Sequence, residues 1–349
     1  MKDTEMKKIR IIDSTLRDGM HAVSHQFSPD DMAVIAAALD AAGVDTVEIG
    51  HGDGQGGSTY QYGFAKASDE DYLRAVSSVL TRSKLDILIL PGIGTEPDIE
   101  LGAKYGAKVV RIATHVTEAD IGAQHIAFTK SLGMEAITFL MMAHMAPVEK
   151  VVEQAKLFES YGADVVYVTD SAGAMLPSEV AEKVSAVKAA VAIPVGFHAH
   201  NNLGLAIGNT LAAVQAGASV VDGCLCGLGA GAGNAQIEVL AAVFDRMHIE
   251  TGIDLYKIMD AAENEVRPRM RQPLAITKLE LSIGWAGVYG SFLLHSIRAG
   301  KKFGVDPRDI LVELGRLKTV GGQEDLIIDV ASRLAAEKEQ RKSQTVAGK

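Results

Sequence analysis

Near its start the chain reads Ile11-Ile12-Asp13-Ser14-Thr15-Leu16-Arg17-Asp18-Gly19-Met20-His21, an apolar run that gives way to an arginine, a carboxylate, a glycine and a histidine. In parallel α/β proteins, catalytic and ligand-binding residues collect at the carboxyl ends of strands. Arg17, Asp18 and His21 would then supply a cation, a metal ligand and a proton carrier at one strand end. They form a site only if the rest of the chain builds a barrel around them.

Apolar runs and helix-length amphipathic segments alternate along the first 264 residues. The runs are rich in Val, Ile and Leu without strict polar alternation, which is typical of buried parallel strands. They cover residues 9–13, 44–49, 85–90, 109–113, 136–141, 165–169, 195–198 and 220–225. Ser28-Pro29 is a helix-start signal, and glycines such as Gly43 end helices just before the next run. The pattern predicts an α/β fold, a (β/α)8 TIM barrel, rather than an open sheet.

The pattern changes after Asn264, where prolines interrupt and only helical signals follow. One helix is expected over 285–301, another from Asp306-Pro307 and a third from near Gln323. We expect a catalytic barrel over 1–264 and a small all-helical C-terminal region over 265–335. Residues 336–349 are charged and then small and polar, which favours a disordered tail.

Composition excludes several classes of partner. Of the 349 residues, 48% are hydrophobic and 22% are charged, and the formal net charge is −10. No stripe of lysine and arginine is present, which argues against nucleic acid or an anionic membrane as a partner. Cys224 and Cys226 are the only cysteines. They are too close for a framework disulfide and are read as buried thiols of a reducing compartment. Residues 1–5 lack a signal core and no apolar run is long enough to span a membrane, so a cytoplasmic location is expected.

A second motif, Val195-Gly196-Phe197-His198-Ala199-His200-Asn201-Asn202, ends the seventh run. Alternate residues of a strand share a face, so His198 and His200 point the same way. Asp18 reaches the same barrel mouth from the first strand. Two imidazoles and one carboxylate leave open positions on a divalent ion, and we prefer this interpretation to a pair of hydrogen-bonded core histidines.

Arg17 would stabilise a developing enolate oxygen, unless it is a solvated surface charge. Histidine as a residue type titrates near neutrality, so His21 suits proton transfer, with His25 as its rival for that role. A Schiff-base lyase needs a lysine inside the barrel, but Lys84 and Lys108 lie at strand beginnings, so a carbon–carbon lyase of this sequence should use a metal.

A glycine-rich segment over 227–233 loosely imitates a dinucleotide-binding loop. The chain turns all-helical soon afterwards and offers no further βαβ unit. We therefore interpret the segment as a tight loop whose backbone approaches the site.

Thr15-Leu16-Arg17-Asp18-Gly19 together with His198-Ala199-His200-Asn201-Asn202 resembles the pyruvate-binding, metal-dependent barrel family that includes HMG-CoA lyase and isopropylmalate and homocitrate synthases. Those synthases typically continue the first motif with Glu-Gln, whereas this chain has Met20-His21. The segments 17–23, Pro91-Gly92-Ile93-Gly94-Thr95 and Ala286-Gly287-Val288-Tyr289 are similar to the 4-hydroxy-2-oxovalerate aldolases of that family. The likeness covers nearly the whole chain.

The resemblance implies a retro-aldol cleavage of 4-hydroxy-2-oxopentanoate to pyruvate and acetaldehyde in the catabolism of aromatic compounds. It implies Asp18, His198 and His200 as ligands of a divalent metal, with Mn²⁺ preferred over Co²⁺ or Mg²⁺. Arg17 matches the residue that stabilises the enolate, and His21 the catalytic base. Tyr289 matches a tyrosine at the aldehyde end, and Ser171 is expected to help hold the keto-acid carboxylate. Arg17, His198 and Tyr289 are the other expected substrate-binding residues. Leu88 or Leu90 is expected to line the alkyl group of the aldehyde.

The resemblance also implies a protein partner, an acylating acetaldehyde dehydrogenase that docks on the helical region. Three alternatives stay open at this point. They are an acyl-CoA-dependent Claisen synthase or lyase of the same family, a non-catalytic binding barrel and a nucleotide-binding protein.

Overall fold

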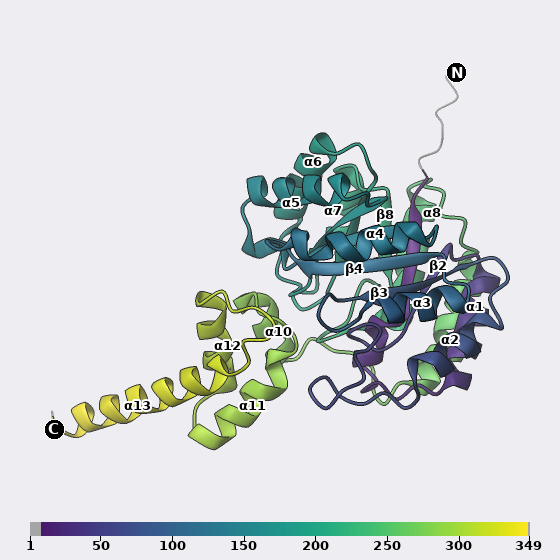
Figure 1. Ribbon diagram of the computed structural model, residues 1–349. Coiled ribbons are helices and arrows are strands. Elements are labelled where there is room, and N and C mark those ends of the chain that lie inside the picture. The colour runs from purple at the N-terminus through teal and green to yellow at the C-terminus, as the bar shows by residue number, and fades with distance from the viewer. Residues whose placement is uncertain (1–7, 348–349) are drawn as a thin grey trace.

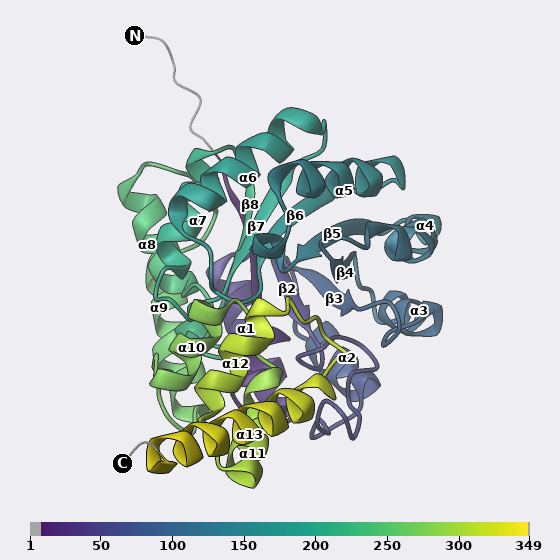
Figure 2. The same ribbon diagram turned by 90° about the vertical axis from the view of Figure 1, so that its left-hand side faces the viewer.

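Eight parallel strands close into a barrel in the computed structural model, which describes residues 8–347 (Figures 1 and 2). Each strand pairs with its sequence neighbours, and β8 returns to pair with β1, with Ile11 opposite Val221. The strands are β1 (Arg10–Leu16), β2 (Thr46–Ile49), β3 (Lys84–Ile89), β4 (Val109–His115), β5 (Glu135–Met141), β6 (Val165–Asp170), β7 (Val195–Ala199) and β8 (Val220–Gly223). The predicted TIM barrel is confirmed.

The outer ring consists of helices that follow the strands, as Figure 2 shows from the side of the C-terminal helices. They are α1 (Pro29–Ala42), α2 (Asp69–Ser77), α3 (Glu96–Lys104), α4 (Ala123–Ser131), α5 (Val148–Ser160), α6 (Pro177–Ala190), α7 (Ala206–Gln215), α8 (Ile237–Arg246) and α9 (Leu255–Asp260). The start signal at Ser28 is confirmed, because Ser28 and Asp31 form a reciprocal capping box. Gly43 ends α1 with a φ of 87°, a left-handed conformation that favours glycine.

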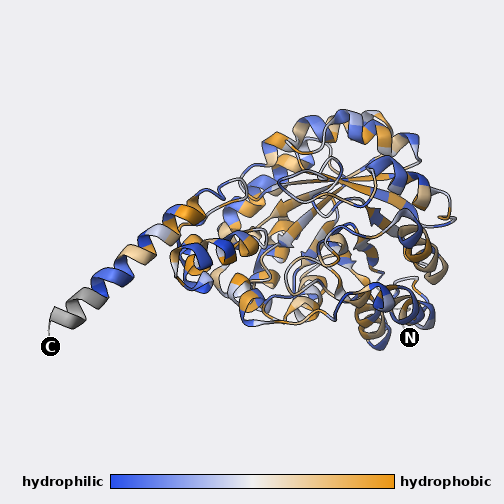
Figure 3. Ribbon diagram, turned by 90° about the horizontal axis from the view of Figure 1, so that it is seen from below, coloured by the Kyte–Doolittle hydropathy of each residue, from blue (hydrophilic) through white to orange (hydrophobic). Residues whose placement is uncertain are grey.

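All predicted strands are present, although their ends differ by a few residues. The clearest difference is β1, which continues through Ser14 and Thr15 to Leu16. These polar residues are compatible with burial because they are bonded: the Thr15 hydroxyl donates to Asp13 at 2.8 Å and accepts from the Leu225 N–H at 2.7 Å. The strands are mostly hydrophobic along their length, as Figure 3 shows.

The barrel interior is filled by side chains rather than forming a pore. Its apolar part includes Ile12, Leu88, Phe139 and Tyr167. Tyr167 extends across β7, where a Cβ on Gly196 would lie 2.2 Å from the tyrosine ring. Glycine at 196 is therefore what makes room for this large aromatic side chain.

Four helices form the C-terminal region, on one side of the barrel in Figure 1. They are α10 (Lys278–Ala286), α11 (Phe292–Phe303), α12 (Pro307–Arg316) and α13 (Leu326–Ala347). The expected single helix over 285–301 is wrong, since Gly287 takes a left-handed conformation (φ 65°) and ends α10 before α11 begins. Asp306 caps α12 as predicted, accepting from the Arg308 N–H.

The expected disordered tail is also wrong as far as Ala347, because α13 continues to that residue. Its charges are arranged to support a helix: Arg333 pairs with Glu337 one turn later and with Glu313 of α12. Residues 348–349, like residues 1–7 of the expected barrel domain, lie outside the described part. None of the described helices is long and apolar enough to cross a membrane.

Candidate active site at the barrel mouth

The residues that follow β1 form a single tight turn. Asp18–His21 is a short 3-10 helix, closed by the Met20 N–H donating to the Arg17 carbonyl at 3.1 Å. The turn leaves Arg17 and Asp18 buried and His21 partly exposed. A strand that ends abruptly in a tight turn thus presents consecutive polar side chains at the barrel mouth.

Asp18, His198 and His200 converge on one point. The Nε2 atoms of His198 and His200 lie 3.3 and 3.5 Å from the same oxygen of Asp18, Oδ2. Possible ligand atoms of the three residues all lie within 4.8 Å of one another, and all three side chains are buried. The structure brings together the three residues that the sequence suggested as metal ligands.

The charges around this cluster are tightly coupled. Burial alone would raise the pKa of Asp18, but Arg17, His200 and His198 hold it well below its usual value. Burial opposes protonation of His198, yet its hydrogen bonds to Asp18 and Asp222 raise its pKa to about 9. Burial and the neighbouring His198 lower the pKa of His200 to about 4. Asp18 therefore stays ionised and faces positive charge from Arg17 and His198.

The donor set fits a divalent metal ion. Two imidazole nitrogens and a carboxylate oxygen suit divalent first-row ions, since imidazole favours ions such as Co²⁺ or Zn²⁺ and the carboxylate also suits Mn²⁺. His198 also has the support expected of a metal-ligating histidine, because its Nδ1–H donates to Asp222 at 2.7 Å. That bond fixes the tautomer that leaves Nε2 free to bind a metal on the side of Asp18.

Arg17 is held beside the cluster by three oxygen atoms. Its Nε donates to Glu48 at 2.9 Å, and its Nη1 lies 3.3 Å from the Gly52 carbonyl and 3.4 Å from Asp18 Oδ2. The guanidinium is therefore buried and oriented, and is not a solvated surface charge.

A network of buried charges, which the sequence reasoning missed, connects Arg17 to His198. Arg111 is fully buried on β4 and donates from Nη2 to both oxygens of Asp222 at 2.8 and 2.6 Å. Its Nη1 lies 3.2 Å from Glu48, the residue that holds Arg17. The available signal was a single charged residue within each of the apolar strands β2, β4 and β8, namely Glu48, Arg111 and Asp222, since a buried charge must be paired.

The structure gives different environments to His21 and His25, the two candidates for the catalytic base. His21 lies against Gly52, where a Cβ would come within 2.5 Å of the imidazole Nε2. His25 is buried, and its Nδ1 accepts from the Gly52 N–H at 3.4 Å. Burial, with the neighbouring imidazoles of His21 and His51, lowers the pKa of His25 to about 3.

Ser171, Leu88 and Leu90 lie at the ends of barrel strands, whereas Tyr289 packs against Phe292 and the core of the C-terminal helices. Ser171 directly follows β6, and its oxygen accepts from the Met142 N–H at 3.0 Å, which leaves its hydroxyl hydrogen able to donate. Tyr289 follows α10, and burial raises its pKa. Its neighbour Gly290 faces Ala230 of the glycine-rich loop. Leu88 is buried in the barrel interior, and Leu90 is half-buried against the same cluster.

The glycine-rich loop closes over the metal-ligand cluster. The Ala230 N–H donates to Asp18 Oδ1 at 3.2 Å, and its carbonyl lies 3.5 Å from His200 Nδ1. This confirms the interpretation of a loop whose backbone approaches the site. Cys224 and Cys226 are buried free thiols. Burial raises the pKa of both, to about 11 for Cys226, which is typical of unreactive cysteines.

Fold and site together define a divalent-metal barrel enzyme, and the comparisons with known proteins agree. The model of the HMGL-like family matches residues 8–264, and that of the DmpG-like communication domain matches residues 274–336. The chain belongs to the HMGL-like family.

Within that family the chain is a member of the 4-hydroxy-2-oxovalerate aldolases. It is 71% identical over 329 residues to the 4-hydroxy-2-oxovalerate aldolase of Carboxydothermus hydrogenoformans, covering 94% of this chain and 98% of that one. It is 60% identical to the protein of the same name from Moorella thermoacetica, covering 94% and 97%.

Among solved structures, the carboxyl transferase domain of Rhizobium etli pyruvate carboxylase with pyruvate and biocytin has a TM-score of 0.80. It is 17% identical, covering 96% of this chain and 61% of that chain. The N-terminal domain of a putative aldolase from Bacteroides vulgatus has a TM-score of 0.70 at 21% identity, covering 83% and 96%. These two likenesses concern the fold alone.

Proposed function

We propose that this protein cleaves 4-hydroxy-2-oxopentanoate to pyruvate and acetaldehyde in a metal-dependent retro-aldol reaction. The observation that carries the proposal is the meeting of His198 Nε2, His200 Nε2 and an Arg17 N–H around one oxygen of Asp18, within 3.5 Å. The names of the relatives agree with this reaction. They also favour it over an acyl-CoA-dependent Claisen reaction.

The metal would be held by Asp18, His198 and His200, and we propose Mn²⁺, with Co²⁺ and Mg²⁺ as alternatives. When bound, such an ion supplies Lewis-acid stabilisation of negative charge on the 2-oxo acid. Glu48 holds Arg17 so that an N–H remains directed at the cluster, where it can donate to the enolate oxygen. Ser171, with its free hydroxyl hydrogen, is suited to bind the keto-acid carboxylate.

His21 is the proposed base. It removes the proton of the C4 hydroxyl, the C3–C4 bond breaks, and the C4 oxygen becomes the aldehyde carbonyl. The bonding electrons pass to the pyruvate enolate, which then takes up a proton at C3. His25 is a poor alternative because its Nδ1 lone pair already accepts from the Gly52 N–H. Tyr289, with its raised pKa, would stay protonated and donate to the aldehyde oxygen.

The test is pyruvate release from 4-hydroxy-2-oxopentanoate, read through lactate dehydrogenase. We expect activity to be lost after chelation and restored by Mn²⁺. Asp18→Asn should remove both the activity and the restoration, whereas Asp120→Asn, on the outer short helix after β4, should change neither. Absence of pyruvate under every condition would reject the proposal, and acetyl-CoA would then be offered as the substrate of the Claisen alternative.

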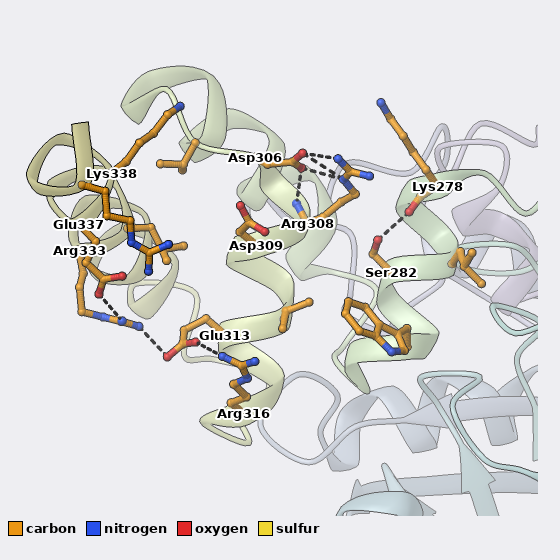
Figure 4. Close-up of a pocket in the computed structure, with 16 residues that line it drawn as sticks. Lys278, Ser282, Asp306, Arg308, Asp309, Glu313, Arg316, Arg333, Glu337 and Lys338 are labelled. Atoms are coloured by element: carbon orange, nitrogen blue, oxygen red, sulfur yellow. Dashed lines mark hydrogen bonds and ion pairs between the residues drawn. The ribbon is translucent and has the colours of Figure 1, made fainter. Parts of the chain in front are cut away.

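We also propose that the C-terminal helices bind an acylating acetaldehyde dehydrogenase. The match to the communication domain supports this, as does a groove of about 1520 Å³ between α10, α12 and α13 (Figure 4). The groove combines the exposed Trp285 with charged residues such as Arg333, which Figure 4 shows bridging Glu313 and Glu337.

Co-elution of the two proteins on a sizing column is the expected result. Trp285→Ser should weaken it, and Leu294→Ser, at another exposed apolar side chain that lies outside the groove, should not. An aldolase-only peak beside free dehydrogenase would count against the partner. A cytoplasmic location, supported by the free cysteines, and a role in aromatic catabolism complete the proposal.

A further inference from the structure

His25 lies at the centre of a cluster of three imidazoles, His21, His25 and His51, that the proposed chemistry uses only in part. The rings of His25 and His51 are stacked, with centroids 3.7 Å apart and an interplanar angle of 18°. The edge of His25 meets His21 at a centroid distance of 5.1 Å. His25 and His51 are both buried, whereas His21 is partly exposed at the mouth.

The two buried histidines have both ring nitrogens occupied. His51 donates from Nε2 to the Gly63 carbonyl at 3.0 Å and accepts at Nδ1 from the Asp53 N–H at 3.1 Å. His25 accepts at Nδ1 from the Gly52 N–H and bonds to the backbone of Tyr62. Asp53 brings a carboxylate near His21 and His25. A second metal site is nevertheless disfavoured, because the lone pair of His25 is directed at the Gly52 N–H.

The backbone of His25 is as constrained as its ring. Ser24 and His25 both have left-handed conformations, with φ of 56° and 58°. The His25 N–H donates to the Met20 carbonyl at 2.7 Å, and its carbonyl accepts from the Lys66 N–H at 3.0 Å. Such conformations cost free energy and persist where the surroundings fix them, often at functional sites. His25 thus ties the turn that carries His21 to the loop after β2.

That loop places Gly52 directly against the base. A Cβ on Gly52 would lie 2.5 Å from Cε1 and Nε2 of His21 and 2.7 Å from Cδ2. Gly52 has no left-handed φ that would by itself require glycine. The lack of a side chain at this position therefore serves the close approach of the His21 ring.

We propose that His25 and Gly52 are positioning residues that together form the seat of the His21 imidazole. The inference rests on the proposed function, in which His21 is the base. Through its ring bond to the Gly52 N–H and its stack on His51, His25 holds Gly52 in place. Gly52 in turn sets where the imidazole lies relative to the C4 hydroxyl.

The test compares two reactions of one site. Decarboxylation of oxaloacetate breaks a C3–C4 bond, releases CO₂ and leaves the same pyruvate enolate, but it has no C4 hydroxyl proton to remove. It should therefore need the metal ligands and Arg17 but not a correctly placed His21. Aldol cleavage needs all of them, and a displacement of about 1 Å can cost on the order of 100-fold in rate.

We expect Gly52→Ala and His25→Asn to lower kcat for aldol cleavage by about 10- to 100-fold, with KM and oxaloacetate decarboxylation changed less than about threefold. Asparagine is chosen because it tolerates the left-handed backbone. Gly208→Ala, a helical site with no atom within 4 Å of the new Cβ, and Ser24→Asn, at the neighbouring left-handed residue, are matched controls. Both should behave as the parent protein.

The inference is overturned if the two variants cleave the substrate at the parent rate, or if both reactions fall equally. An equal loss of both activities would show that His25 and Gly52 maintain the whole active site and not the position of His21 in particular. Failure of the parent protein itself to cleave 4-hydroxy-2-oxopentanoate would instead reject the proposed function, so the two failures are distinguishable.

Discussion

Asp222→Asn should weaken metal binding, although Asp222 is not one of the proposed metal ligands. Asp222 Oδ2 accepts from both His198 Nδ1 and Arg111 Nη2, while Oδ1 accepts from Arg111 and the Tyr167 hydroxyl. In Asp222→Asn an NH₂ group replaces one of these two oxygens, and an NH₂ group cannot accept a hydrogen bond. Either His198 then loses the acceptor that fixes its tautomer, or Arg111 loses one of its two hydrogen bonds to this side chain.

The magnitude follows from these contacts. Loss of such a second partner of a ligating histidine typically lowers metal affinity 10- to 100-fold, which is about 1.4 to 2.7 kcal/mol. Unpairing a buried charge costs about 3 to 5 kcal/mol of stability. The lower end applies here, because Glu48 still lies 3.2 Å from Arg111 Nη1 and keeps one opposite charge beside it.

Isothermal titration calorimetry, with Mn²⁺ added to protein freed of metal by a chelator, measures the affinity, and urea unfolding measures the stability. Asp86→Asn is the matched control, since Asp86 is also fully buried and lies 3.8 Å from Arg111 Nε. Burial and the charge of Glu48 raise the pKa of Asp86 well above its usual value, which favours the neutral carboxyl that asparagine resembles. The reasoning is refuted if Asp222→Asn binds Mn²⁺ as tightly as the parent, or if Asp86→Asn loses as much affinity.

Three further outcomes are expected. Arg17→Ala should lower kcat by about 100- to 1,000-fold while leaving Mn²⁺ affinity within a few-fold, because the proposed role of Arg17 is to donate to the enolate and not to bind the metal. Undiminished turnover would remove Arg17 from the mechanism. His21→Ala should abolish the pH dependence set by the base, and an unchanged profile of kcat against pH would move that role to another residue. Burial raises the pKa of Asp13 to about 7, so the native protein keeps this proton while the unfolded chain releases it above about pH 4. The free energy of unfolding should therefore fall as pH rises from about 4 to 7, by up to roughly 4 kcal/mol. In Asp13→Asn, the free energy measured by urea unfolding should change less with pH over that range.

The barrel could be predicted from the sequence because each strand contributes a Val-, Ile- and Leu-rich run, and glycines mark the helix ends before them. The metal-ligand cluster could be predicted because its residues follow strand ends, where parallel topology brings distant segments together. The break between α10 and α11 could not, since Gly287 occurs within a helix-like pattern and its left-handed φ depends on tertiary packing. The His144 imidazole, 3.1 Å from the Gly287 carbonyl, is part of that packing.

The seat of His21 lay beyond sequence reasoning for a different reason. Gly52 and His51 follow β2, whereas His21 and His25 follow β1, and nothing in local pattern says that these loops touch. The contact arises because β1 and β2 are neighbours in the barrel, with Leu16 opposite Ile49 at their mouth ends. Side-chain contacts between loops depend on which strands are neighbours, and the residue pattern within either loop does not specify that.

The buried charges explain why this mouth suits a metal and an anionic substrate. Arg17 and Arg111 lie against the carboxylates of Asp18, Glu48 and Asp222, and the raised pKa of His198 places a further positive charge between Asp18 and Asp222. A divalent cation held by Asp18, His198 and His200 would displace the proton of His198 and so raise the charge of the site by one. A 2-oxo acid monoanion would cancel that increase. Because uncompensated charge is costly in a buried site, this balance favours binding the ion and the substrate together over either alone.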